Sequence, residues 1–294
     1  MDVDSSLRSS WPVLVRVTAV VLTWRDVADT LACVDTLLES DRISRIIVVD
    51  NESTGALSDH MACPRRERVT LRQEARNLGF SAGVNIGLRM AAHQTRELLL
   101  IINNDARILD SDLALLCETL TSNQNLSMVA PRIIDESGRE EASWGSMTAA
   151  LGIDHSINPE MADYFTWACV LVRGSIFEDL GYLDESFFMY WEDVDFGLRM
   201  RRHGLVCEYV PRATATHSRS SSHVTAGSAI QKYSTHGLMV LARKESRIVA
   251  GIGRALMRGA KYLVRGKPRH ALACLEGLWL ALARPDARGC ELFP

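Results

Sequence analysis

The chain has 294 residues, of which 47% are hydrophobic and 23% are charged, and its formal net charge is −3. This composition is typical of a globular protein with one large domain, or one domain with an appendage. No run of about 18 uncharged apolar residues occurs, so we expect no transmembrane span. The net charge alone argues neither for nor against nucleic acid, which we do not expect as a partner.

The seven cysteines are scattered and show no CxxC or metal-finger spacing, which favours reduced thiols. Residues 13–24 are mostly apolar, but Asp2 and Asp4 precede them and Arg16 interrupts them, unlike in a signal peptide. We therefore expect residues 1–15 to be a flexible lead-in. The protein is expected in the cytoplasm, either free or peripheral on the inner face of the membrane.

Strands and helices alternate along the first part of the chain. The continuous apolar run at residues 17–22 is typical of a strand that is buried on both faces. Apolar positions at helical spacing follow over residues 26–39. The alternation continues with strands at 43–49, 69–72 and 98–102, and helices at 80–90 and 112–120, the last capped by Asp110 or Ser111. This pattern predicts an α/β fold with a mostly parallel sheet flanked by helices.

The second part of the chain has a looser pattern. Residues 135–165 are rich in Gly, Ser, Asp and Glu and predict a loop-rich excursion. We expect strands at 167–172 and 206–210, a helix at 192–202, and a mostly helical segment at 230–283 that is broken at 266–268.

Polar residues end each early strand: Thr23-Trp24-Arg25, Asp50-Asn51 and Asn103-Asn104-Asp105. Open α/β sheets bind ligands at the carboxyl ends of their strands. A nucleoside needs a flat apolar surface and a few fixed polar groups. Trp24 is suited to the first task, and Asp50 to accepting from a ribose hydroxyl or a base N–H. The alternative for Asp50-Asn51 is an Asx turn.

The glycine-rich segment from Asn77 to Gly87 matches neither of the two common phosphate-loop patterns. Gly83 and Gly87 lie four residues apart, on one helix face, where they allow close packing on the sheet. Asn77 and Gly79 stand at the helix entrance, where they can line a nucleotide pocket.

Two acidic motifs carry the candidate chemistry. Asp105 follows a buried strand, where its carboxylate can bind Mg²⁺ or Mn²⁺ together with phosphate and water oxygens; a simple helix cap is the alternative. Asp193 is expected in the first turn of a helix, whose dipole favours its ionised form, so that it can take a proton from a hydroxyl. Glu192 can orient Asp193 or bind acceptor hydroxyls, and Asp195 pairs with Arg199 on the surface.

Five ordered motifs between residues 16 and 220 resemble family-2 inverting glycosyltransferases of the GT-A fold, close to rhamnosyltransferase-like and galactofuranosyltransferase-like members. The motifs are VVLTW (20–24), VVDNEST (48–54), NLGFSAGVN (77–85), LIINND (100–105) and GYLDESFFMYWEDVD (181–195). Asn103 departs from the family's DxD motif, which lowers the negative charge of the site. Thr-Trp-Arg at 23–25 replaces the more usual Thr-Tyr-Asn.

The resemblance implies a role for each matching residue. Asp193 is the base, and Asp105 and His217 hold the metal. Trp167, Trp191 and Glu192 are candidates for the acceptor site. The nucleotide-sugar donor would contact Thr23, Trp24, Asp50, Asn77, Gly79, Phe80, Asn103, Asn104 and Asp105.

The same resemblance implies a catalytic domain at residues 16–225, with a nucleotide-sugar half (16–110) and an acceptor half (111–225). A helical basic extension follows at 226–294. Residues 243–269 carry nine Lys or Arg and one acid, a net charge of +8. The rest of the chain therefore has a net charge of −11. Such a segment indicates contact with an anionic surface or substrate, or simply a solvated helix face.

The expected reaction moves a sugar, with inversion, from a donor such as dTDP-rhamnose or a UDP-sugar to a hydroxyl. The acceptor is a glycan, a lipid-linked molecule or a small molecule, and the sequence leaves this choice and the oligomeric state open. Two alternatives remain: a nucleotidyltransferase that makes sugar nucleotides, and an inactive nucleotide-sugar-binding protein, which the neutral Asn103 favours.

Overall fold

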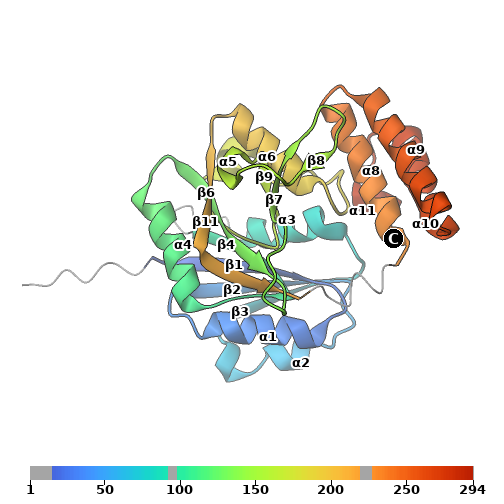
Figure 1. The fold of residues 1–294 in the computed structure, drawn as a ribbon. Coiled ribbons are helices and arrows are strands. Elements are labelled where there is room, and N and C mark those ends of the chain that lie inside the picture. The colour runs from blue at the N-terminus through green and yellow to red at the C-terminus, as the bar shows by residue number, and fades with distance from the viewer. Residues whose placement is uncertain (1–14, 92–97, 219–226, 294) are drawn as a thin grey trace, which may run out of the picture.

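The computed structural model describes residues 15–91, 98–218 and 227–293 (Figure 1). Apart from Val15, the expected lead-in at residues 1–15 lies outside this range. The described residues form an eight-stranded central sheet and a small three-stranded sheet. The spatial order of the central sheet is β3 (Val69–Glu74), β2 (Ile43–Asn51), β1 (Val17–Thr23), β4 (Leu98–Asn103), β10 (Cys169–Arg173), β6 (Leu126–Ile134), β11 (Val206–His217) and β5 (Ala106–Ile108).

The first four strands of this order run parallel, as the alternating sequence pattern predicts. Strand β10 is antiparallel to both of its neighbours, β4 and β6. Strand β11 is parallel to β6, and the short β5 pairs with it in the opposite direction. The fold is therefore the expected α/β fold, with a parallel first half and a mixed second half.

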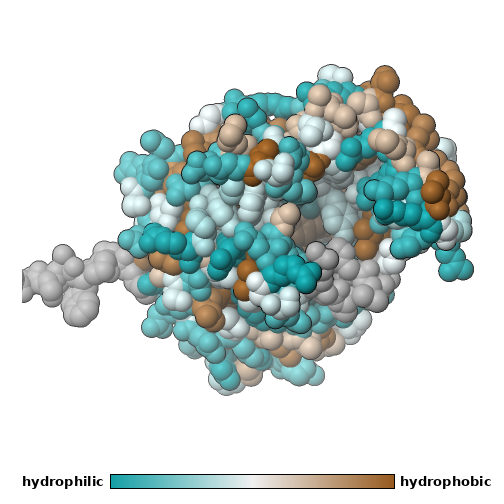
Figure 2. All heavy atoms as spheres, in the orientation of Figure 1, coloured by the Kyte–Doolittle hydropathy of each residue, from teal (hydrophilic) through white to brown (hydrophobic). Residues whose placement is uncertain are grey.

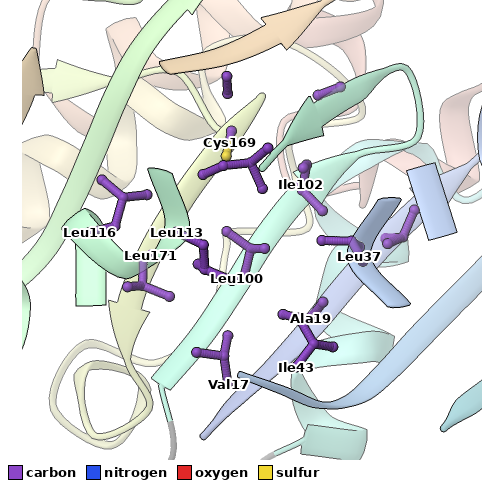
Figure 3. Packing of buried hydrophobic residues seen from close by; sticks show 14 of the residues in the cluster. Val17, Ala19, Leu37, Ile43, Leu100, Ile102, Leu113, Leu116, Cys169 and Leu171 are labelled. Carbon is purple, nitrogen blue, oxygen red and sulfur yellow. The ribbon is translucent and has the colours of Figure 1, made fainter. Parts of the chain in front are cut away.

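Helices cover both faces of the sheet, which explains the continuous apolar strands. Helices α1 (Val27–Leu38) and α4 (Asp110–Ser122) pack on one face, where Figure 3 shows Leu37 and Leu113 beside Ala19 and Leu100. Helices α3 (Gly79–Ala91), α5 (Ile176–Leu180) and α6 (Glu192–Arg202) pack on the other. Val20 belongs to this second core, so successive residues of β1 serve opposite faces.

The glycines of α3 allow it to lie close to the sheet, as expected. A Cβ at Gly83 would lie 2.5 Å from a methyl group of Leu22, and one at Gly87 would lie 2.4 Å from Val20. Gly79, where α3 begins, has a φ of +82°, and a Cβ there would meet the Phe188 carbonyl oxygen at 2.3 Å. Close contact of α3 with the sheet therefore depends on these glycines.

One local expectation is wrong. Helix α4 begins at Asp110 without a side-chain cap; Asp110 accepts a hydrogen bond from Ser40 and pairs with Arg42. Residues 135–165 are loop-rich, as expected, but they also contain the small sheet of β7 (Trp144–Met147), β8 (Ile153–Asp154) and β9 (Tyr164–Phe165), and the 3-10 turn η2 (Pro159–Met161). These strands are two to four residues long, too short for an alternating pattern to be visible.

The C-terminal part is helical, as expected, and consists of α8 (Ala229–Lys244), α9 (Ile248–Val264), α10 (Pro268–Ala283) and the short α11 (Gly289–Leu292). The break at residues 266–268 separates α9 from α10. A further break at Ser246, with a φ of +57°, separates α8 from α9. The sequence does not predict this break, because the break contains no Gly or Pro. Two short elements, α2 (Ser58–Met61) and η1 (Pro64–Arg66), connect β2 to β3.

The helices in the described part of the chain are all too short or too polar to cross a membrane. All seven cysteines are free.

Candidate active site

A pocket of about 250 Å³ opens where the parallel strands end, between the sheet and the C-terminal helices. Figure 2 shows the surface hollowed in this region. Asp105 and Asp193, which lie far apart in the sequence, both line it. The other candidate residues that line it are Trp24, Asn77, Gly79, Phe80, Asn103, Asn104, Trp167, Glu192 and His217.

Asp105 and His217 meet because β5 folds back on β11. Asp105 lies between β4 and β5, and Ala106 pairs with His217 at the end of β11. His217 Nε2 lies 3.3 Å from Asp105 Oδ1, and its Nδ1 lies 3.1 Å from Glu141 Oε2. Burial alone would lower the pKa of His217, but hydrogen bonding and the negative charges of Asp105 and Glu141 outweigh burial and raise it.

This pair has the donor chemistry of a divalent metal site. Adjacent ligands of an octahedral Mg²⁺ or Mn²⁺ lie about 3 Å apart, since each metal–ligand bond is about 2.1 Å long. The 3.3 Å between Asp105 Oδ1 and His217 Nε2 fits this geometry. Over the described ranges no three His, Cys, Asp or Glu side chains are arranged to enclose an ion. A metal held here would therefore need further ligands from phosphate and water.

The two asparagines before Asp105 have different surroundings. The Nδ2 of Asn103 lies 3.5 Å from His217 Nε2, so Asn103 borders the same ligand pair. Asn104 is buried, and its Nδ2 donates to the hydroxyl of Thr30 on α1 at 3.3 Å. Asn103 is thus an uncharged neighbour of this candidate ligand pair, whereas Asn104 holds the turn between β4 and β5 to α1.

Trp24 and the Asn77–Phe80 segment form one wall of the pocket, and two residues of β2 and its turn hold them. The indole nitrogen of Trp24 donates to Glu52 at 2.7 Å. Asn51 Nδ2 donates to Asn77 Oδ1 and to the Gly79 carbonyl oxygen, both at 3.0 Å. Asn51 therefore bridges to the next loop instead of forming the Asx turn considered above.

Thr23 and Asp50 do not line the main pocket. They lie opposite each other at the ends of β1 and β2 and line a second, adjacent hollow with Arg25 and Thr54. Both side chains are buried. Successive residues thus line different hollows: Trp24 and Asn51 line the main pocket, and Thr23 and Asp50 line the second.

Glu192 and Asp193 begin α6 at the opposite wall, after two consecutive residues with left-handed φ, Tyr190 and Trp191. Burial raises the pKa of Asp193 to about 6, although the Val194 N–H donates to its Oδ1 at 2.8 Å. Burial and the charge of Asp193 raise the pKa of Glu192 well above its usual value. Burial therefore outweighs the helix dipole, which we had expected to favour the ionised form.

Glu192 has one further unusual feature. Its side chain is buried at the pocket, and its Oε2 has no hydrogen-bond partner among the described residues. A protonated Glu192 beside an ionised Asp193 presents a donor and an acceptor to the same ligand. When two carboxyl groups are adjacent at a buried site, the repulsion between their negative charges favours the state in which one of them is protonated.

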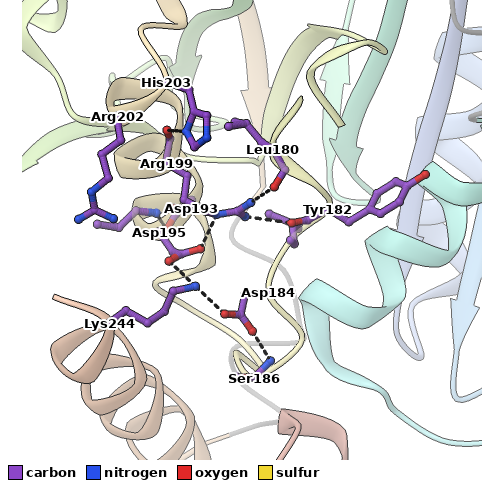
Figure 4. A network of polar contacts seen from close by, with 12 residues as sticks. Leu180, Tyr182, Asp184, Ser186, Asp193, Asp195, Arg199, Arg202, His203 and Lys244 are labelled. Atoms are coloured by element: carbon purple, nitrogen blue, oxygen red, sulfur yellow. Dashed lines mark hydrogen bonds and ion pairs between the residues drawn. The ribbon is translucent and has the colours of Figure 1, made fainter. Parts of the chain in front are cut away.

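The sequence suggested that Asp195 lies on the surface, but the residue is buried, with only 1% of its surface exposed. Figure 4 shows it between Arg199, at 2.9 Å, and Lys244 of α8, at 2.7 Å. Lys244 also pairs with Asp184 at 2.5 Å. The expected Asp195–Arg199 pair is present, but its function here is to fasten α6 to the C-terminal helices.

Aromatic residues complete the pocket. Trp167 lines it and packs edge-on against Phe196 of α6. Trp191 lies behind the wall, where its indole nitrogen donates to the Ser234 carbonyl oxygen at 2.9 Å, so its position gives no support to an acceptor contact. Sequence reasoning did not select the further lining residues Phe188, Met189, Tyr190, Ile230 and Tyr233.

Comparison with known proteins agrees with this geometry. The profile of the family described as glycosyltransferase-like family 2 matches residues 15–235. The hexosyltransferase Agl10 of low-salt glycan biosynthesis in Haloferax volcanii is 30% identical over 65% of this chain and 64% of its own length. The N-acetylglucosaminyl-diphospho-decaprenol L-rhamnosyltransferase of Mycobacterium tuberculosis is 26% identical over 63% of this chain and 70% of its own. The chain thus spans a little under two thirds of the Haloferax protein.

Solved structures share the fold at low sequence identity. GalNAc-T7 with UDP, GalNAc and Mn²⁺ superposes with a TM-score of 0.62 at 13% identity, over 78% of this chain and 48% of its own. The mannosyltransferase PcManGT of Pyrobaculum calidifontis with GDP-Man and Mn²⁺ gives 0.55 at 16% identity, over 94% of this chain and 77% of its own. These likenesses support the GT-A fold, and the profile match confirms the family indicated by the five motifs: the chain belongs to glycosyltransferase-like family 2.

Proposed function

We propose that the protein is an inverting glycosyltransferase that moves a sugar from a nucleotide-sugar donor to an acceptor hydroxyl. The observation that carries this proposal is the position of Asp105 and Asp193 on one pocket, beside Trp24 and the Asn77–Phe80 wall. A candidate metal ligand and a candidate base then flank the same bound donor. Residues 16–225 form the catalytic domain in this proposal, and residues 226–294 are its helical extension.

The donor half of the pocket lies at residues 16–110. Trp24, Asn77, Gly79, Phe80 and Asn103–Asp105 line the pocket and Thr23 and Asp50 the adjoining hollow, where the nucleoside and diphosphate are bound. A relative from Shigella flexneri is 23% identical over 68% of both chains and is named dTDP-rhamnosyl transferase RfbF. Its name favours dTDP-rhamnose as the donor. UDP-sugars are the second choice, because GalNAc-T7 was solved with UDP.

The transfer step is a single displacement. The acceptor hydroxyl gives its proton to the ionised carboxylate of Asp193, and its oxygen forms a bond to the anomeric carbon. The bond from that carbon to the donor phosphate breaks on the opposite face, and the nucleoside diphosphate leaves with the electron pair. The configuration of the sugar is therefore inverted.

Asp105 and His217 are the residues that would hold Mg²⁺ or Mn²⁺. When bound, the ion supplies positive charge that stabilises the leaving diphosphate. Glu141 hydrogen-bonds the other nitrogen of His217 and so fixes the orientation of the ring.

The acceptor side is formed by Glu192, Trp167 and the aromatic residues near α8. A buried, protonated Glu192 donates a hydrogen bond to an acceptor oxygen, and the apolar wall suits the flat face of a sugar or an apolar aglycone. The acceptor is a glycan, a lipid-linked molecule or a small molecule. The M. tuberculosis relative, named for a decaprenol-linked substrate, favours the lipid-linked class.

A donor screen tests the proposal. We expect dTDP- or UDP-sugars with Mn²⁺ to raise the melting temperature of the wild-type protein, and the best donor to be hydrolysed slowly without an acceptor. Chelation of the metal should abolish the release of nucleoside diphosphate, and Asp193→Asn should reduce it strongly.

Two results would contradict the proposal. Release of pyrophosphate from a nucleoside triphosphate and a sugar phosphate identifies a nucleotidyltransferase instead. Donor binding without hydrolysis or transfer to any hydroxyl acceptor identifies an inactive binding protein.

A further inference from the structure

Helix α9 turns its small residues inward and its large apolar residues outward. Its buried positions are Gly251, Ala255 and Gly259, and a Cβ at Gly251 would lie 2.6 Å from the Cβ of Ala242 on α8. Val264, by contrast, is 89% exposed. A helix that only covers a core buries its largest apolar side chains. The outward apolar side of α9 therefore calls for another explanation.

Helix α10 continues this exposed surface. Of the 13 exposed large apolar side chains in the described part of the chain, ten lie on α9 and α10. Trp279 is 65% exposed and shares a stripe with Leu272 and Leu275, at helical spacing. Figure 2 shows brown residues over these helices. We call this surface the C-terminal apolar face; its main members are Val249, Leu256, Met257, Val264, Leu272 and Trp279.

Positive charge borders the apolar face. Residues 246–284 contain eight Lys or Arg and one acid, Glu276, a net charge of +7. Lys261, Arg265, Lys267 and Arg269 are exposed at the end of α9 and the start of α10 and form a basic stripe, whereas the half-buried Arg258 donates to the Ser234 hydroxyl on α8. A helix with an exposed apolar side and an adjacent row of Lys and Arg binds in the plane of an anionic bilayer surface.

We propose that α9 and α10 dock the protein on the surface of an anionic lipid bilayer. The C-terminal apolar face enters the boundary between headgroups and acyl chains, and the basic stripe contacts the headgroup phosphates. A second copy of this chain fits the face less well, because the two copies would bring like charges together. Acidic lipids match both the charge and the apolar area.

This docking also brings the pocket close to the bilayer. Helix α8 packs against both α9 and α10, and it carries Ile230 and Tyr233 at the pocket. The pocket is thus separated from the docking helices by a single helix. The inference depends on surface chemistry alone, so its failure would leave the proposed transfer reaction intact.

Vesicle co-sedimentation of the full chain tests the proposal, without donor, metal or acceptor. The probes are vesicles of phosphatidylcholine mixed with phosphatidylglycerol, and vesicles of phosphatidylcholine alone. We expect the wild-type protein to bind the mixed vesicles at least about tenfold more tightly, since each basic residue near an anionic surface contributes favourably.

Three variants locate the contact. Val264→Asp with Trp279→Asp, and separately Lys261→Gln with Arg265→Gln, should each weaken binding to mixed vesicles by about tenfold or more. Met161→Asp is the matched control: Met161 is 74% exposed but lies on η2, away from the C-terminal helices, and its substitution should leave binding unchanged.

Equal binding of both vesicle types, or equal loss with Met161→Asp, would overturn the proposal. So would a protein that binds no vesicles but forms dimers that Val264→Asp with Trp279→Asp dissociates in analytical ultracentrifugation. That last result would identify the face as a contact between copies. All of these residues are exposed, so circular dichroism and melting temperature can verify that each variant is folded.

Discussion

Burial raises the pKa values of two neighbouring carboxyl groups, Glu192 and Asp193. The pKa of Asp193 is raised to about 6, so its carboxylate is mostly ionised at neutral pH. The pKa of Glu192 is also raised well above its usual value, by burial and by the charge of Asp193. In the proposed mechanism, ionised Asp193 accepts a proton, while Glu192, when protonated, donates a hydrogen bond to the same ligand.

Replacing the proposed base should affect turnover more than binding. We expect Asp193→Asn to lower kcat by about 10²–10⁴-fold, the usual contribution of a positioned base, with little change in the KM for the donor. For the wild type, kcat/KM should fall as the pH drops below about 6, because protonated Asp193 cannot accept a proton. Near-normal turnover of Asp193→Asn, or activity that is flat through this range, would contradict the role of Asp193.

The same residue makes a prediction about stability. Because folding raises the pKa of Asp193 above its ordinary value of 3.8, ionisation destabilises the folded state as the pH rises through this window to about 6. Asp193→Asn should therefore melt at a higher temperature than the wild type near pH 8, and the difference should vanish near pH 4. A constant difference at both pH values would show that packing, not charge, is responsible.

Glu141 offers a test of the metal site that leaves both proposed ligands in place. We expect Glu141→Gln to weaken Mn²⁺ binding by about 10–100-fold, because it removes the charge that orients and polarises His217. Electron paramagnetic resonance of Mn²⁺ with nucleoside diphosphate measures the affinity. Glu140→Gln, next in sequence and bonded to Tyr209 instead, is the control and should bind Mn²⁺ normally. Equal affinities of the two variants would contradict the role of Glu141.

Asp105 and Asp193 can be predicted from sequence because each one adjoins an element with a clear apolar pattern. Glu141 cannot, since it lies in a segment without periodicity and reaches His217 only through the tertiary fold. Asn51 is similar: its neighbours indicate a turn, but its amide bonds to Asn77 and Gly79, which are distant in the chain. Contacts across the sheet edge leave no local signal in the sequence.

At the level of elements, α6 is held in place from the side opposite the pocket. Asp195 is two residues from the proposed base, so its side chain points to the other side of α6, and it pairs with both Arg199 and Lys244 (Figure 4). Arg199 also donates to the carbonyl oxygens of Leu180 and Tyr182, at the start of the loop that leads to α6. The start of α6 is therefore fixed by charges in the interior, not by a side-chain cap.

Removing one partner of this network should be costly. We expect Lys244→Met to lower the free energy of unfolding by about 3 kcal/mol, because Asp195 is left buried with a reduced counter-charge. Urea denaturation measures the change. Lys232→Met is the matched control: its lysine side chain has the same 29% exposure, but it pairs loosely with the exposed Glu276, at 3.8 Å, so the loss should stay below about 1 kcal/mol. Equal losses would show that the Asp195 pair adds nothing specific.

The parallel strands and long helices can be predicted because runs such as residues 17–22 are apolar over their full length. Strand β10 is also visible as an apolar run, but its reversed direction is not, since a strand's direction depends on the path of the chain before it. The small sheet of β7, β8 and β9 has strands that are too short to show a pattern. The sequence predicts only residues 206–210 of β11, because the register of the strand becomes irregular between Val210 and Thr214.

On the scale of the whole molecule, the C-terminal helices do more than follow the catalytic part. Phe293, at 1% exposure, packs against Phe188 and Tyr233 of the pocket wall, with ring centroids 5.2 and 4.9 Å apart. Gly289 donates its N–H to the Glu185 carbonyl oxygen in the loop that leads to α6. The C-terminal segment therefore supports the side of the pocket where we propose that the acceptor binds.

Truncating Phe293 should loosen that wall. We expect Phe293→Ala to lower the free energy of unfolding by about 3–5 kcal/mol and to raise the KM for the acceptor. Phe293→Leu, which keeps most of the volume, should cost less than about 1.5 kcal/mol and restore the KM. A normal acceptor KM for Phe293→Ala, measured well below its melting temperature, would show that the wall does not depend on this contact.

A crystal structure with Mn²⁺ and a nucleoside diphosphate would decide whether the two acidic motifs serve one bound donor. Anomalous scattering would locate the ion. The account predicts Mn²⁺ between Asp105 and His217, the diphosphate on the ion, and the terminal phosphate facing Asp193 across the pocket. An ion bound elsewhere, or a diphosphate whose terminal phosphate points away from Asp193, would contradict it.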